Sequence, residues 1–287
     1  MASEQMQVFL DAFRDAPPKT NKPSFEQQRA DMDAYMAGQV APDDVLVDDY
    51  TLAGRPARKY FRSGVREDAS ILYLHGGGYC VGSLDSHHAF TAHLAVACAT
   101  SVNALDYRLA PENPYPAALD DAIAAFLEMA KYLPADRIMI AGDSAGGGLA
   151  LSCALTLKER GLPLPGCLAL LSPATDLTAS GESLSEFQQE YRDGALPYVG
   201  EHDATDAGIS PLFGDMAGLP PLLVHVASDE AMLDDSTRLQ ARALEAGVDV
   251  ELRRFDEAFH VFHIFTHLPE SQDALAHIGE FCRKHIR

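Results

Sequence analysis

The segment Arg137-Ile-Met-Ile-Ala-Gly-Asp-Ser-Ala-Gly-Gly-Gly-Leu149 carries the strongest structural signal in this 287-residue sequence. Its first apolar residues predict a buried strand, and the small residues from position 145 onward predict a helix. Between them, Gly142-Asp-Ser-Ala-Gly146 has the Gly-x-Ser-x-Gly spacing of a sharp strand-to-helix turn. Such a turn lifts the Ser144 hydroxyl above the sheet edge, at a helix N-terminus that favours negative charge. We therefore predict that Ser144 is a nucleophile and that Gly142 and Gly146 shape the turn.

A glycine-rich turn of this kind has two other interpretations. It could pack a helix against a strand without any chemistry, although the strand-turn-helix context favours a nucleophile. A phosphate-binding loop is excluded, because no Gly-Lys-Ser/Thr follows and no G-x-G-x-x-G spacing fits. Asp143, which precedes the serine, is expected to have a structural role near the turn.

A second glycine-rich motif, His75-Gly-Gly-Gly78, follows the apolar run 71–74. A tetrahedral oxyanion needs two or three N–H donors that converge on one point, and consecutive glycines let the backbone approach that closely. We predict Gly77 and Gly78 as two donors, with the N–H of Ala145 as the third. His75 and Gly76 are expected to support the loop rather than to react.

Elsewhere the sequence alternates short apolar strands with helices. Each strand–helix alternation needs a crossover, and repeated crossovers produce a mostly parallel sheet covered on both faces. Strands are predicted at 45–50, 57–62, 70–75, 102–107, 137–142, 167–172, 221–227 and 250–255, and helices near 87–99, 117–131, 145–160, 235–246 and 272–284. Residues 1–40 predict two amphipathic helices with a Pro-rich break at 15–23. The polar segment 178–213 shows no strand and no hydrophobic lid surface.

A third motif, Asp106-Tyr-Arg-Leu-Ala-Pro-Glu112 with its Pro-Tyr-Pro-Ala tail, completes a family resemblance. HGGG, DYRLAPE and GDSAGG in this order resemble the hormone-sensitive-lipase-like branch of the α/β hydrolases, whose best-known members are bacterial carboxylesterases. The resemblance covers roughly residues 45–287. It implies an α/β-hydrolase fold, with a mostly parallel eight-stranded sheet flanked by helices and a small N-terminal helical cap. We accordingly expect a cap at 1–44, completed by about 178–213, and a catalytic domain at 45–287.

The base of a catalytic triad should lie late in the chain, because serine, acid and histidine follow one another in that order in this fold. The histidines beyond about position 220 that compete are His225, His260, His263, His267, His277 and His285. Phe259-His-Val-Phe262 resembles the family's His-Gly-Phe motif, which implies His260 as the base. His260, His263 and His267 also have an i, i+3, i+7 spacing that could coordinate a metal ion. No HExxH-type motif accompanies them, so we expect no metal and no other cofactor.

The acid is expected within the segment 226–235, which contains four carboxylates. The family usually shows Gly-x-x-Asp-Pro-Leu-x-Asp here. That pattern places Ala227 on the glycine and Glu230 on the catalytic aspartate. Glu230 is therefore the predicted acid, with Asp229 as the alternative. Either carboxylate can hold an imidazole in its working tautomer.

Together these residues predict a serine carboxylesterase that passes through an acyl-enzyme intermediate on Ser144. The resemblance suggests short- to medium-chain acyl esters, and the missing lid surface argues against long-chain lipase activity. One alternative is an amidase or lactamase with the same triad. Another is a non-catalytic binding protein, like the plant gibberellin receptors of this branch, although those lack the catalytic histidine that His260 provides here.

Composition limits the partners of the chain. Asp and Glu number 42 against 22 Lys and Arg, and the formal charge of −20 repels nucleic-acid phosphates and anionic lipid headgroups. No apolar run approaches the roughly 18 residues of a membrane helix, and the N-terminal residues lack the basic region of a secretory signal. Five cysteines without a CxxC pair are typical of reduced thiols. We expect a cytoplasmic enzyme that acts on a small-molecule ester, without nucleic-acid partners or membrane insertion. The family resemblance also suggests a homodimer.

Overall fold

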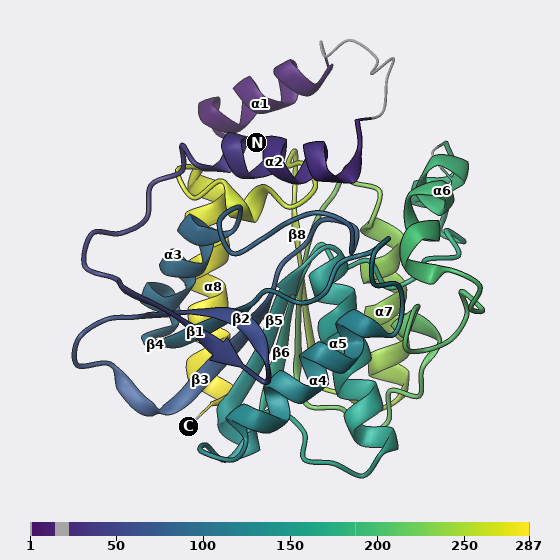
Figure 1. Ribbon diagram of the computed structural model, residues 1–287. Coiled ribbons are helices and arrows are strands. Elements are labelled where there is room, and N and C mark those ends of the chain that lie inside the picture. The colour runs from purple at the N-terminus through teal and green to yellow at the C-terminus, as the bar shows by residue number, and fades with distance from the viewer. Residues whose placement is uncertain (1, 15–22, 187, 287) are drawn as a thin grey trace.

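Eight strands form one sheet in the order β1-β2-β4-β3-β5-β6-β7-β8 in the computed structural model, which describes residues 2–14, 23–186 and 188–286 (Figure 1). The pairs β1–β2 and β2–β4 are antiparallel, and all the others are parallel. The strands are β1 Leu46–Leu52, β2 Arg55–Phe61, β3 Arg66–Leu74, β4 Thr100–Leu105, β5 Ile138–Asp143, β6 Cys167–Leu171, β7 Leu222–Ala227 and β8 Val250–Phe255. The predicted mostly parallel, eight-stranded sheet is confirmed.

The helices also follow the sequence pattern, with one exception. They are α1 Glu4–Arg14, α2 Phe25–Met36, α3 His88–Cys98, α4 Ala117–Met129, α5 Ala145–Glu159, α6 Gln188–Val199, α7 Leu233–Glu245 and α8 Pro269–His285. Helix α6 lies in the segment 178–213, for which we expected no strand and which was not among the predicted helices. The predicted break at 15–23 lies outside the described residues except for its last position.

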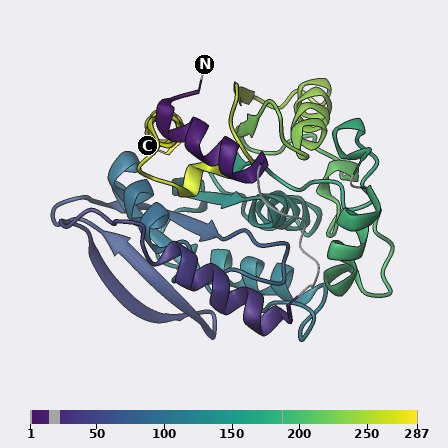
Figure 2. The same ribbon diagram turned by 90° about the horizontal axis from the view of Figure 1, so that it is seen from above.

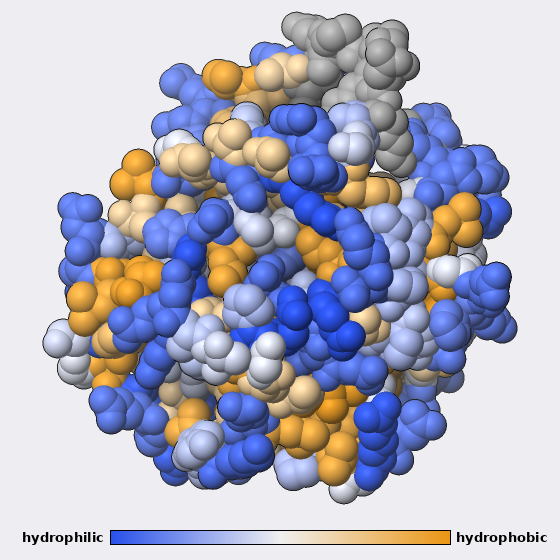
Figure 3. All heavy atoms as spheres, viewed as in Figure 1, coloured by the Kyte–Doolittle hydropathy of each residue, from blue (hydrophilic) through white to orange (hydrophobic). Residues whose placement is uncertain are grey.

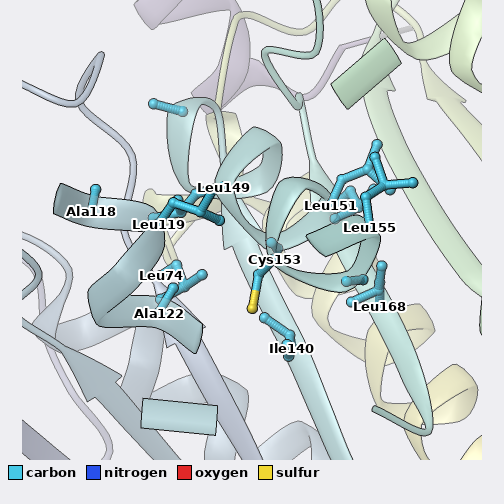
Figure 4. Close-up of a cluster of buried hydrophobic side chains, with 14 of the residues drawn as sticks. Leu74, Ala118, Leu119, Ala122, Ile140, Leu149, Leu151, Cys153, Leu155 and Leu168 are labelled. Atoms are coloured by element: carbon cyan, nitrogen blue, oxygen red, sulfur yellow. The ribbon is translucent and has the colours of Figure 1, made fainter. Parts of the chain in front are cut away.

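Alternate side chains of the central strands enter two separate cores, one on each face of the sheet. Leu72 and Leu74 of β3 pack with α4 and α5, whereas Ile71 and Tyr73 pack with α3 and α8. Figure 4 shows the first core, in which side chains of α4 and α5 meet those of the strands. Burial on both faces explains why these strands are almost continuously apolar in sequence. The turns that leave the carboxyl ends of the parallel strands all reach the same edge of the sheet.

The two N-terminal helices lie across that edge (Figures 1 and 2). In α1, the ring of Phe9 stacks on Phe259, with ring centroids 5.5 Å apart. In α2, Nε of Arg29 donates a hydrogen bond to the carbonyl of Cys80 at 2.8 Å. These helices therefore contact the loop after the HGGG motif and the loop that carries His260.

The face of the molecule shown in Figure 3 is largely hydrophilic, with hydrophobic side chains in scattered groups. Within the described ranges, no helix has both the length and the apolar character needed to cross a bilayer.

Candidate active site

Ser144 lies at the turn between β5 and α5, where the Gly-x-Ser-x-Gly pattern predicted it. Its backbone has φ 50° and ψ −119°, a combination that non-glycine residues rarely adopt. The Ser144 N–H donates to the carbonyl of Leu171 at 2.8 Å, which ties the turn to the end of β6. A Cβ on Gly146 would collide with the carbonyl of Leu74, and one on Gly142 with the carbonyl of Gly146. The two glycines are therefore required by close backbone packing.

Three sequence-predicted side chains meet at this turn. The Ser144 hydroxyl is 2.9 Å from Nε2 of His260, and Nδ1 of His260 is 3.2 Å from Oε1 of Glu230. His260 follows β8 and Glu230 follows β7, so both arrive on loops at the same sheet edge. Asp229 is exposed, and within the described ranges no hydrogen bond or ion pair joins it to His260. The structure thus brings Glu230, and not Asp229, to the histidine.

Glu230 is held in place by two further groups. The hydroxyl of Ser172 donates to Oε2 of Glu230 at 2.8 Å, and the N–H of Ala227 donates to the same oxygen at 3.2 Å. The carboxylate is buried, so these donors replace the water it loses. Sequence reasoning missed Ser172, because it lies 58 positions before Glu230 in no recognisable motif.

Glu230 also sets the basicity of His260. Desolvation lowers the pKa of His260, but the hydrogen bond and the negative charge of Glu230 outweigh it, and the net pKa is raised. The histidine side chain is still 42% exposed, so a substrate can reach it. A neutral imidazole here can accept the serine proton, and the carboxylate then stabilises the imidazolium.

The HGGG loop presents unused N–H groups beside the serine. Gly77 has φ +116° and Gly78 has φ +60°, both in the range that favours glycine. Among the described residues, the N–H groups of Gly77 and Gly78 donate to no protein acceptor. Ala145 is the first residue of α5, where an N–H has no partner inside the helix. Gly78, Ser144 and Ala145 line the same cavity.

Asp143 links the serine turn to the HGGG loop. Its Oδ1 accepts hydrogen bonds from the Gly76 N–H at 2.9 Å and from the Tyr73 hydroxyl at 2.5 Å, and Nε2 of His87 lies 3.4 Å from Oδ2. Burial alone would raise the pKa of Asp143, but His87 and Tyr73 lower it to about 2. The carboxylate therefore stays ionised and fixes Gly76, in keeping with the structural role expected for it.

His75 supports the same loop from the other side. Its ring stacks on Tyr107 with centroids 4.4 Å apart, and the Tyr107 hydroxyl donates to the His75 carbonyl at 2.7 Å. Burial lowers the pKa of His75 to about 4, so the ring is neutral near pH 7. Sequence reasoning did not single out Tyr107, although its place in the DYRLAPE motif was a signal that could have identified it.

A cavity of about 300 Å³ opens beside the serine. Helix α6 forms one of its walls and buries Ala195, Tyr198 and Val199. Our prediction that 178–213 offers no hydrophobic lid surface is not tested by this burial and stays a prediction. The cavity is lined by Gly78, Tyr79, Ser144, Ala145, Ala174, Leu177, Glu190, Tyr191, Gly194 and Ala195. A larger hollow of about 680 Å³, between β1, β2 and the end of α4, contains none of the site residues.

The histidines that share a metal-like spacing with His260 do not converge with it. His263 is buried and stacks with His225, with centroids 5.5 Å apart, whereas Nδ1 of His267 lies 3.3 Å from the side-chain oxygen of Gln39. In the part of the chain that the structure describes, no group of three or more His, Cys, Asp or Glu side chains could hold a metal ion.

A parallel sheet with a strained serine turn after β5, and a histidine and a carboxylate on later loops, defines an α/β hydrolase. Residues 71–264 match a family described as alpha/beta hydrolase fold. An acetyl-hydrolase of Streptomyces hygroscopicus is 37% identical over 254 residues, which cover 85% of this chain and 83% of that protein. The crystal structure of an esterase from the bacterial hormone-sensitive lipase family has a TM-score of 0.93 at 37% identity and covers 100% of both chains. An esterase/lipase from an uncultured bacterium has a TM-score of 0.94 at 35% identity, covering 99% of both.

The chain belongs to the α/β-hydrolase family, in its hormone-sensitive-lipase-like branch, and is a carboxylic ester hydrolase. The resemblance and the enzyme class predicted from the three motifs are confirmed.

Proposed function

We propose that this enzyme hydrolyses short- to medium-chain acyl esters through a triad of Ser144, His260 and Glu230. The observation that supports the proposal most directly is the chain of hydrogen-bond contacts from the serine hydroxyl through both ring nitrogens to the carboxylate, at 2.9 and 3.2 Å. These distances suit proton transfer without rearrangement of the side chains.

In this mechanism, His260 removes the proton of Ser144 while Oγ attacks the ester carbonyl carbon. The N–H groups of Gly77, Gly78 and Ala145 hold the resulting oxyanion. The intermediate collapses, the alcohol leaves with the proton from the imidazolium, and an acyl-enzyme remains. Water then attacks the acyl group, with His260 again as the base. The bond to Ser144 Oγ breaks, the imidazolium returns its proton to Oγ, and the carboxylic acid is released.

The expected chain length follows from the cavity beside the serine. A space of about 300 Å³ lies at the lower end of the usual size of ligand pockets. The name acetyl-hydrolase, given to the relative from Streptomyces hygroscopicus, supports the same substrate class. Rates measured with p-nitrophenyl esters from C2 to C12 should peak well below C12; a maximum at C12 would contradict the assignment.

The triad is tested with p-nitrophenyl butyrate and with Ser144→Ala. We expect the variant to lose about 10⁴- to 10⁶-fold in kcat, and an organophosphate to add one equivalent to Ser144 in the wild type. Labelling at another residue, or activity that survives in the variant, would refute the mechanism. The anilide with the same acyl group tests the amidase alternative. We expect it to be hydrolysed far more slowly than p-nitrophenyl butyrate, and a comparable rate would favour an amidase.

We also propose that residues 1–44 and the segment 178–213 act as a cap. The contact of Arg29 with Cys80 and the cavity wall formed by α6 support this division. A cytoplasmic location is supported by the burial of all five cysteines, which is typical of reduced thiols that pack in a core. The family resemblance also suggests a homodimer, and size-exclusion chromatography with light scattering tests it.

A further inference from the structure

The mechanism gives no role to the carboxylate of Glu190, one of the residues that line the cavity. It lies in the first turn of α6, one helical turn before Gly194, and both positions line the cavity. Among the described residues that line this cavity, Glu190 is the single Asp, Glu, Lys or Arg. The remaining lining groups are glycines, alanines, a leucine, two tyrosines and the nucleophile.

The side chain of Glu190 is exposed, and in the described ranges no hydrogen bond or ion pair neutralises its charge. Arg192, two residues later, donates instead to the carbonyl of Thr178 at 2.7 Å. A carboxylate at a helix N-terminus is favourable by itself, so a purely structural role predicts that neutralising it changes stability and leaves substrate preference alone.

We infer that Glu190 is a specificity-determining residue that selects against esters carrying a carboxylate near the scissile bond, and thereby favours neutral and cationic esters. The inference rests on the proposed function, because it places the substrate of Ser144 in the cavity that Glu190 lines. A substrate carboxylate about 7 Å from Glu190, at an effective dielectric constant between about 30 and 80, would bind about 3- to 15-fold more weakly.

The experiment uses two pairs of esters in which an acetyl group replaces the carboxylate without much change of size. Methyl levulinate and monomethyl succinate carry the difference in the acyl part, and 4-acetoxyacetophenone and 4-acetoxybenzoate carry it in the alcohol part. For each pair, the ratio of kcat/KM for the neutral ester to that for the anionic ester is measured at low ionic strength. Using both pairs covers either orientation of the substrate in the cavity.

Glu190→Gln should lower this ratio about 3- to 15-fold for at least one pair, and Glu190→Lys should lower it further. Asp193→Asn is the matched control, because it removes the same charge from the same helix at a position that does not line the cavity. It should change the ratio less than twofold. Addition of 0.5 M salt should reduce the effect of Glu190→Gln, since mobile ions screen exposed charges.

An unchanged ratio in Glu190→Gln for both pairs would overturn the inference, as would an equal change in Asp193→Asn, which would show a general effect of net charge. Failure of the proposed function has a different signature. In that case the wild type would not hydrolyse the neutral esters, or Ser144→Ala would hydrolyse them as well. A ratio also cancels any loss of folded protein, which lowers both rates equally.

Discussion

Shortening the acid by one methylene group, in Glu230→Asp, tests the proposed triad most sharply. The carboxylate would retract by about 1.5 Å, which lengthens the 3.2 Å contact with His260 to about 4.7 Å. It would also leave the hydroxyl of Ser172, now 2.8 Å away, without its acceptor. Loss of a charge-assisted hydrogen bond of about 1.5–3 kcal/mol corresponds to a fall of about 10- to 150-fold in kcat.

The assay is hydrolysis of p-nitrophenyl butyrate, with kcat taken from the alkaline plateau of each protein's pH profile. Glu230→Ala gives the lower limit, about 10³- to 10⁴-fold below the wild type. Asp229→Asn is the control and should stay within twofold of the wild type, because its side chain is exposed. A Glu230→Asp variant within threefold of the wild type would refute the argument, and an equal loss in Asp229→Asn would reassign the acid.

Three further predictions concern pH, stability and chain length. Because Glu230 raises the pKa of His260, activity should fall as pH drops through that pKa, and Glu230→Gln should move this acid limb of kcat/KM to lower pH; an unmoved limb would contradict the coupling. Burial lowers the pKa of His263 to about 3 in the folded protein, whereas in the unfolded chain a histidine has a pKa near 6.5. Between these two pH values the unfolded state binds a proton that the folded state does not bind, so stability falls as the pH drops from about 6.5 to about 3. His263→Phe should remove about 4 kcal/mol of that loss at pH 3.5, seen as a flatter plot of Tm against pH, whereas parallel plots would exclude it. A Cβ on Gly194 meets no atom within 4 Å, so Gly194→Leu should reduce hexanoate hydrolysis at least tenfold relative to acetate; an unchanged profile would show that chain length is set elsewhere.

The centre of the sheet could be predicted because β5, β6 and β7 are buried on both faces and are short, mainly apolar runs. The edge strand β8 carries charged residues, yet it was predicted with the bounds that it has, Val250–Phe255. Helix α6 was missed for the opposite reason. Its apolar residues, Tyr191, Ala195 and Tyr198, have helical spacing, but they stand among charged residues with Gly194 and Pro197 inside the helix.

The candidate site divides in the same way. Motifs predicted Ser144, the HGGG loop and His260, because each needs a local backbone shape that the sequence reveals. Glu230 required a comparison with the family pattern, since four carboxylates lie within ten residues. The group that orients it, Ser172, follows a different strand, and only the folded chain brings the two together.

The stacking of Phe9 on Phe259 also has a consequence for the synthesis of the protein. Translation delivers the first helix some 250 residues before the ring that covers it, and contacts of such sequence separation form late in folding. During synthesis, the apolar side of α1 therefore stays uncovered until the ribosome has made almost the whole chain. Prematurely terminated products would keep that side uncovered, which makes them natural targets for chaperones and proteases.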